Sequence, residues 1–79
     1  MARTVKGVLF AIDPQESEIV RLGSSFWLLE DGHVRRIHCL EALSLIERGS
    51  FEVLPNKLPV AVPESWLRMK ELPLLFRPS

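Results

Sequence analysis

The side chains best suited to bind a metal are two histidines and one cysteine: His33, His38 and Cys39. The two histidines lie five residues apart in a strand-like stretch, so they are expected to point to opposite faces. The sequence has no CxxC or HxxxH spacing of the kind that tetrahedral zinc sites use. We therefore expect no metal and no cofactor. Cys39 is instead expected to be buried on the face of a helix.

Residues that could serve nucleophilic or acid–base catalysis are also isolated. Ser24 and Ser25 have no base beside them, and the preceding Gly23 favours a turn. Glu41 and Glu47 lie six residues apart, so they do not share a helix face. We therefore predict that the chain contains no catalytic residue and is not an enzyme by itself.

A set of basic residues provides the candidates for contacting an RNA backbone: Arg35, Arg36, Lys57, Arg68 and Lys70. The chain has 10 basic and 10 acidic side chains and no net charge, whereas proteins that capture RNA by electrostatics alone are usually basic. An ordinary surface of mixed charge is therefore the alternative for these residues. Trp27 and Trp66 could stack on bases, but their positions in the pattern favour the core or an interface.

The composition is typical of one small globular domain: 79 residues, of which 47% are hydrophobic and 25% are charged. A single cysteine allows no internal disulfide, which favours a reducing, intracellular compartment. The longest unbroken apolar run, residues 8–12, is too short to cross a bilayer, and we expect no signal peptide. We assign residues 5–71 to the core of the domain and residues 72–79 to an apolar extended tail.

The element that organises the chain is a helix predicted over residues 39–48. Gly49 is suited to end this helix, and apolar residues at helical spacing form one stripe: Cys39, Ala42, Leu43 and Ile46. Burial of the stripe predicts that Leu43→Ala costs about 2–5 kcal/mol. Residues 50–54 then alternate polar and apolar as a strand does, and residues 55–57 are predicted to end that strand.

Turn signals upstream of the helix predict two hairpins, formed by residues 4–12 with 19–22 and by residues 26–29 with 33–38. The first hairpin turns at Asp13-Pro14. The second turns at Asp31-Gly32, because glycine tolerates the positive φ of a tight turn. Residues 26–29 are apolar on both strand faces, which predicts either a central strand or a face covered by another element.

Prolines shape the C-terminal part of the chain. Residues 58–62 are expected to be extended, and Pro63 predicts the start of a second short helix near residues 63–71. Val62 cannot cap that helix, which weakens its start by about 1 kcal/mol. The tail is too apolar for a loose terminus, so we predict a contact with another chain, for instance in a homodimer, through Leu72, Leu74, Leu75 and Phe76. The alternatives are packing on its own sheet or a lead into a further domain.

Together these elements predict an α+β fold. A small antiparallel sheet of about four or five strands would pack against one main helix, with a second short helix near the C-terminus. Apolar side chains on the inner faces of these elements are expected to form the core: Val8, Phe10, Ile19, Phe26, Leu28, Ile37, Ala42, Leu43, Ile46, Phe51 and Val53.

Three segments, in the same order, resemble the N-terminal domain of subunits of tRNA-splicing endonuclease. The run CLEALSLIERGSFEVL from Cys39 is similar to that family's helix–strand signature, in which an EAL-[hydrophobic]-LLE-x-G pattern leads into a strand. The segment RLGSSFW from Arg21 resembles the "GSFW" segment of the eukaryotic structural subunit. The segment KLPVAVPESW from Lys57 resembles that subunit's entry into a second helix.

The resemblance implies a non-catalytic structural domain that scaffolds a catalytic subunit and helps to position precursor tRNA for intron removal. It also implies a location in the nucleus. The nuclease domains of that family cut RNA with a tyrosine, a histidine and a lysine, and this chain has no tyrosine. The 79 residues do not include the C-terminal nuclease-like domain through which those subunits pair, so we expect either a fragment of a longer chain or a stand-alone relative. The alternative is a stand-alone protein-interaction module with no role in RNA processing.

Overall fold

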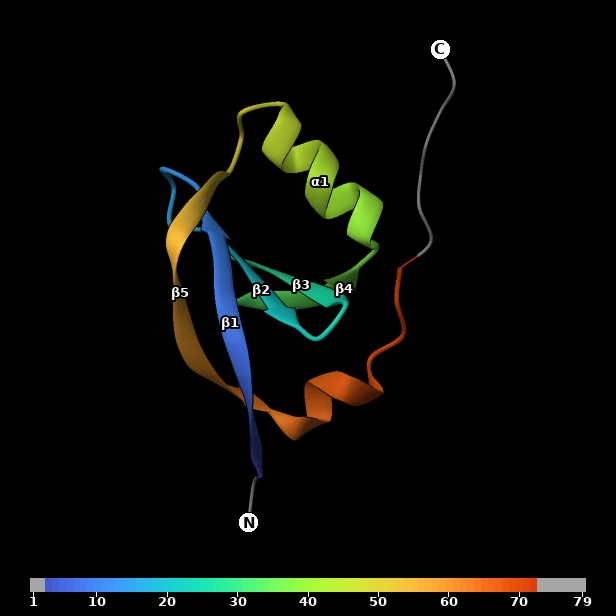
Figure 1. The fold of residues 1–79 in the computed structure, drawn as a ribbon. Coiled ribbons are helices and arrows are strands. Elements are labelled where there is room, and N and C mark those ends of the chain that lie inside the picture. The colour runs from blue at the N-terminus through green and yellow to red at the C-terminus, as the bar shows by residue number, and fades with distance from the viewer. Residues whose placement is uncertain (1–2, 73–79) are drawn as a thin grey trace.

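The computed structural model describes residues 3–72 of the chain. Five strands form one antiparallel sheet in the order β4-β3-β2-β1-β5 (Figure 1). The elements in chain order are β1 (Thr4–Ile12), β2 (Glu18–Leu22), β3 (Ser25–Glu30), β4 (His33–Ile37), α1 (Cys39–Glu47), β5 (Glu52–Pro63) and the 3-10 helix η1 (Glu64–Arg68). The predicted α+β class is confirmed in its coarse form, because the sheet dominates and α1 is the one α-helix of this part of the chain.

Both predicted hairpins are confirmed, and local turn chemistry explains them. The carboxylate of Asp13 accepts hydrogen bonds from the backbone N–H groups of Gln15 and Ser17, at 2.9 and 2.6 Å, and so closes the turn between β1 and β2. Asp31 and Gly32 form the two-residue turn between β3 and β4, with φ values of 48° and 75°. Such a turn twists in the same sense as the strands that it joins.

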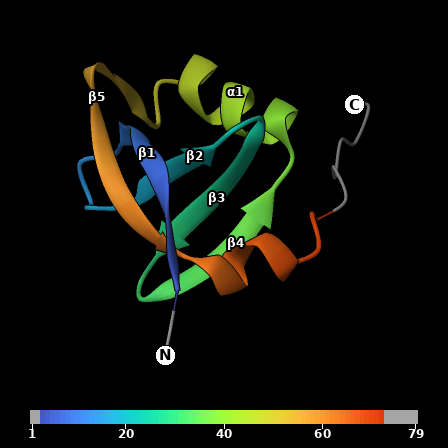
Figure 2. The same ribbon diagram turned by 60° about the horizontal axis from the view of Figure 1, so that its bottom comes forward.

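The two faces of the sheet are covered by different elements. Figure 1 and Figure 2 show α1 over one face, whereas η1 lies against the other. The core beneath α1 consists of Ala11, Ile19, Phe26, Leu28, Ile37, Ala42 and Phe51, with Phe10, Leu45 and Ile46 packed against it. The ring of Phe10 meets that of Phe26 edge-on, with the centroids 5.4 Å apart. Most of the predicted core is therefore confirmed.

The predicted stripe of α1 is wrong by a rotation of the helix. Leu43 is 48% exposed and Cys39 is exposed, whereas Leu45 joins Ala42 and Ile46 at the core. The segment carries two overlapping apolar stripes, and the one that contains Leu45 packs against the core of the sheet. The backbone N–H groups of residues 50 and 51 both donate to the carbonyl oxygen of Leu45, which closes the end of the helix before β5 begins. The predicted cost of Leu43→Ala is therefore too high, because this side chain is about half exposed.

The sequence predicted that the last strand ends at residues 55–57, and this prediction is wrong. β5 continues to Pro63, and its pairing with β1 jumps from Val53 opposite Ala11 to Leu58 opposite Leu9. Residues 54–57 therefore bulge from the ladder, which fits a segment whose proline has no N–H to donate. Val53, predicted to be in the core, is 42% exposed on this edge strand.

The predicted second helix over residues 63–71 is instead the five-residue 3-10 helix η1. Pro63 at its start makes no side-chain capping hydrogen bond, and Val62 is the last buried residue of β5. The uncapped start fits a short element, and the C-terminal end is closed by a hydrogen bond from the Met69 N–H to the Trp66 carbonyl oxygen.

The sheet has a second buried cluster on the face of η1, which the predicted core omitted. Val20, Trp27 and Val62 are no more than 3% exposed there. Gly7 lies beneath them, and a Cβ at this position would come within 2.7 Å of Val62 Cγ2. This cluster confirms the prediction that the apolar residues on both faces of β3 are covered. No helix within residues 3–72 is long and apolar enough to span a membrane.

Candidate functional site

An open hollow of about 610 Å³ lies at one end of the sheet, on the face that η1 covers. Three parts of the chain form it: the turn between β1 and β2, the turn between β3 and β4, and η1. Its lining residues are Ile12, Asp13, Glu16, Glu18, Leu29, Glu30, Asp31, Gly32, His33, Val34 and Trp66. Alternate turns of an antiparallel meander lie at the same end of a sheet, which brings these two turns together.

The floor of the hollow is a row of side chains that crosses four strands. Ile12 pairs with Glu18, Glu18 with Leu29, and Leu29 with Val34, so these residues share one face of the sheet. Ile12 is 36% exposed, and the other three are half-buried. The floor is thus apolar except for one carboxylate, that of Glu18, which stands between two aliphatic neighbours.

The rim of the hollow is acidic. The Asp13 carboxylate is occupied by its turn hydrogen bonds, and that of Glu30 lies 3.8 Å from the guanidinium of Arg35 on an exposed surface. Glu16 and Asp31 are exposed and, like Glu18, take no part in either ion pair of residues 3–72. Among the described residues, no three His, Cys, Asp or Glu side chains are grouped to hold a metal ion. The carboxylates are therefore spread around an opening rather than focused on a point.

A cluster around Arg36 closes the opposite end of the same face. The Arg36 guanidinium lies over the ring of Trp27, 5.4 Å from its centroid. It donates to the carbonyl oxygen of Met69 at 3.1 Å and to the hydroxyl of Ser25 at 2.9 Å. The Trp27 Nε1–H donates to the carbonyl oxygen of Trp66 at 3.2 Å, and the two indole rings are 6.2 Å apart. Both tryptophans thus serve packing, as the sequence favoured.

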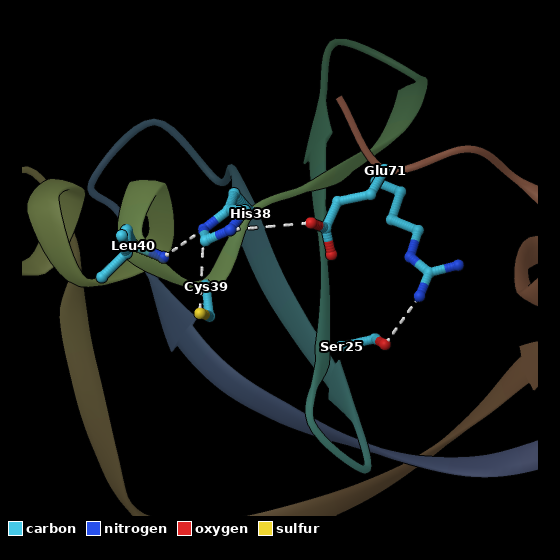
Figure 3. Close-up of polar contacts among 6 residues, drawn as sticks. Ser25, His38, Cys39, Leu40 and Glu71 are labelled. Carbon is cyan, nitrogen blue, oxygen red and sulfur yellow. Dashed lines mark hydrogen bonds and ion pairs between the residues drawn. The ribbon is translucent and has the colours of Figure 1, made fainter. Parts of the chain in front are cut away.

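These contacts fasten the C-terminal segment to the edge of the sheet. The N–H of Leu72 donates to the backbone carbonyl of Arg36 at 3.0 Å. The imidazole Nε2 of His38 lies 3.8 Å from a carboxylate oxygen of Glu71 (Figure 3). Leu72 is 40% exposed. The other residues predicted for the tail interface, Leu74, Leu75 and Phe76, lie outside the described part of the chain.

The predicted RNA-contacting residues are not all gathered into one patch, although the bond from Arg36 to the Met69 carbonyl brings Arg36 near Arg68 and Lys70. Arg36 is committed to the internal contacts above, and Arg35 faces Glu30. Lys57 lies in the bulge of β5, at the edge of the sheet opposite to β4. Arg68 and Lys70 are exposed near the end of η1.

The remaining candidate residues for chemistry have local structural roles. His38 caps α1, because its Nδ1 accepts the N–H of Leu40 at 3.1 Å, and the exposed Sγ of Cys39 lies 3.8 Å from the same nitrogen (Figure 3). The prediction that Cys39 is buried is therefore wrong, since the rotation of α1 turns it outward. Ser24 belongs to the turn that follows Gly23, as predicted, whereas Ser25 begins β3.

Comparisons with known proteins yield no relationship: no protein-family model, curated protein or solved structure matches the chain. The resemblance to splicing endonuclease subunits therefore depends on the three sequence segments alone.

The hollow itself was missed by the sequence reasoning, although a signal for it was present. Acidic residues accumulate in the turn at 13–18 and again at 30–31. The two predicted hairpins, placed consecutively in one antiparallel meander, would have brought these turns to the same end of the sheet.

Proposed function

We propose that this chain is a non-catalytic protein-interaction domain that scaffolds a partner. The observation that carries the proposal is the open hollow, in which the aliphatic floor remains accessible beneath an acidic rim. Accessible apolar surface in a concave site is the usual basis of protein recognition. The candidate catalytic side chains are, by contrast, dispersed over turns, caps and strand ends.

A more specific form of the proposal follows from the resemblance. The partner would be the catalytic subunit of a tRNA-splicing endonuclease, and the assembly, located in the nucleus, would position precursor tRNA. The order of elements supports this form, because α1 is followed by β5 over the segment that resembles the family's helix–strand signature.

In this form the domain contributes little to RNA binding by itself. Its basic side chains are separated or engaged in internal contacts, and the carboxylates of the hollow repel phosphate groups. Contact with the tRNA would therefore come mainly from the assembled subunits.

The second candidate function is a stand-alone interaction module with no role in RNA processing. The acidic hollow favours it, because a surface of this charge is suited to a protein partner rather than to a nucleic acid.

Co-purification separates the two candidates. The tagged chain, expressed in its native cells, is expected to recover an endonuclease catalytic subunit, with a full-length structural subunit as the positive control. The purified chain alone should bind precursor tRNA weakly, with an affinity that falls steeply with salt, and should not cut it. Recovery of unrelated proteins only would support the stand-alone module. Tight, salt-insensitive tRNA binding by the isolated chain would contradict both candidates.

A further inference from the structure

The central feature of the acidic hollow is the position of Glu18 in its floor. Glu18 is half-buried at the start of the central strand β2, between Ile12 on β1 and Leu29 on β3. The two ion pairs of the described residues involve other carboxylates, those of Glu30 and Glu71. Glu18 therefore presents a negative charge, without a cation beside it, in an otherwise aliphatic row.

This arrangement restricts what can cover the hollow. A purely apolar partner would bury the Glu18 carboxylate without compensation, which is strongly unfavourable. A partner that is cationic but not apolar would leave Ile12, Leu29 and Val34 in contact with poorly matched polar groups. The surface is therefore complementary to a segment that carries both cationic and apolar side chains.

The distribution of charge further limits the kinds of ligand that could bind in the hollow. The rim carboxylates of Glu16 and Asp31 add to that of Glu18, and they do not converge as the ligands of a metal ion would. The same carboxylates repel phosphate groups, so the hollow is not suited to nucleic acid or to a phosphorylated ligand. A volume of about 610 Å³ is sufficient for a few side chains of a peptide.

We propose that the hollow binds a segment of a partner protein in which Lys or Arg side chains alternate with aliphatic or aromatic ones. The cations would face Glu18 and the rim, and the apolar side chains would cover Ile12, Val34 and the edge of Trp66. The inference depends on the proposed interaction function and names the chemistry of its partner. The chain's own sequence Phe76-Arg77 has a similar character, so a second copy is an alternative occupant that the test must separate.

The test is a titration of the full chain with a synthetic peptide of alternating Lys and Leu, followed by amide NMR and by tryptophan fluorescence. Trp27 is fully buried, so a fluorescence change reports mainly on Trp66. A peptide with Glu in place of Lys is the charge control. We expect the Lys–Leu peptide to bind and to shift the amides of Ile12, Glu18, Leu29 and Val34, and we expect the Glu–Leu peptide not to bind.

Glu18→Gln keeps the shape of the side chain and removes its charge, and it should weaken binding of the Lys–Leu peptide about tenfold, as the loss of a charged hydrogen bond does. Glu41→Gln is the matched control, because Glu41 is also half-buried but lies on α1, and it should leave the affinity unchanged. Glu16→Gln in the exposed turn is a second variant should Glu18→Gln fail to fold. Equal effects of the hollow variants and of Glu41→Gln would overturn the proposal.

Two further results would also overturn it. Tighter binding of the peptide after deletion of residues 73–79 would mean that the chain's own tail occupies the hollow. Dilution-dependent shifts of the hollow amides, together with a dimer mass, would assign the site to a second copy. If the hollow binds no peptide but co-purification still recovers a partner, the interaction function stands and only this docking site is wrong.

Discussion

The contacts of Arg36 lead to a prediction that separates a structural role from an RNA-binding role. Replacement by methionine, Arg36→Met, keeps a long side chain but removes the guanidinium. The variant loses the hydrogen bonds to the Met69 carbonyl and the Ser25 hydroxyl, and it loses the stacking on Trp27. Each of these contacts joins β4 either to β3 or to the C-terminal segment, so their loss should loosen the end of the chain and the second buried cluster.

The magnitude follows from the kind and burial of these contacts. Hydrogen bonds from a charged donor contribute roughly 1.5–3 kcal/mol each, and the lower end applies because the side chain is only half-buried. The cation–π contact adds about 0.5–1 kcal/mol. The Nε of Arg36 is buried without a partner among the described residues, which offsets part of this gain. The net loss for Arg36→Met is therefore about 2–3 kcal/mol, a large fraction of the stability of a small domain.

Urea unfolding followed by tryptophan fluorescence measures this loss directly. A loss of this size should also lower Tm by roughly 10–20 °C in a domain of this length. Arg35→Met is the matched control, since the neighbouring side chain makes one exposed ion pair at 3.8 Å and should change stability by less than about 1 kcal/mol. Equal stability of the two variants would refute the structural role of Arg36. A loss of tRNA binding in Arg36→Met without a loss of stability would return this residue to the RNA-contacting set.

Three further predictions concern the helix, the second cluster and the tail. Leu45→Ala should lower the free energy of unfolding by about 1–3 kcal/mol, because Leu45 contacts the core. Leu43→Ala should lower it by less than about 1 kcal/mol, because Leu43 is about half exposed. Urea unfolding measures both values, and the reverse order would contradict the observed rotation of α1. Gly7→Ala should destabilise by about 1–3 kcal/mol, since the added Cβ meets Val62 at 2.7 Å, and an unchanged Tm would mean that β1 can move away from β5. Deletion of residues 73–79 should abolish any dimer seen by light scattering while changing the monomer's Tm by only a few degrees. A monomer before and after deletion, with a large fall in Tm, would place the tail in the core instead.

Local rules were sufficient for the first half of the chain. The hairpin turns at Asp13 and at Asp31-Gly32 depend on side chain-to-backbone hydrogen bonds and on backbone angles that neighbouring residues determine. The run Phe26–Leu29 is apolar on both faces of its strand. Other elements therefore had to cover both faces, whichever elements these were. The fold class, the order of the strands in these hairpins and most of the core could therefore be predicted.

The second half depended on contacts that no local pattern contains. Two apolar stripes overlap on α1, and packing of Leu45 and Ile46 against the core of the sheet selected one of them. β5 continues beyond Pro55 because β1 is long enough to pair with both of its arms. η1 is held in place by a hydrogen bond from the Trp27 Nε1–H to the Trp66 carbonyl oxygen, and Trp27 lies 39 residues earlier in the chain.

The candidate site follows the same division. The sequence by itself determined which residues are acidic, that they cluster in two turns, and that the strands beside them alternate in polarity. Only the tertiary structure decided that Ile12, Glu18, Leu29 and Val34 form one row, because a row across strands depends on register, and register is set by pairing over the whole sheet. The same pairing placed Arg36 over Trp27 and so gives this candidate RNA contact a structural role as well.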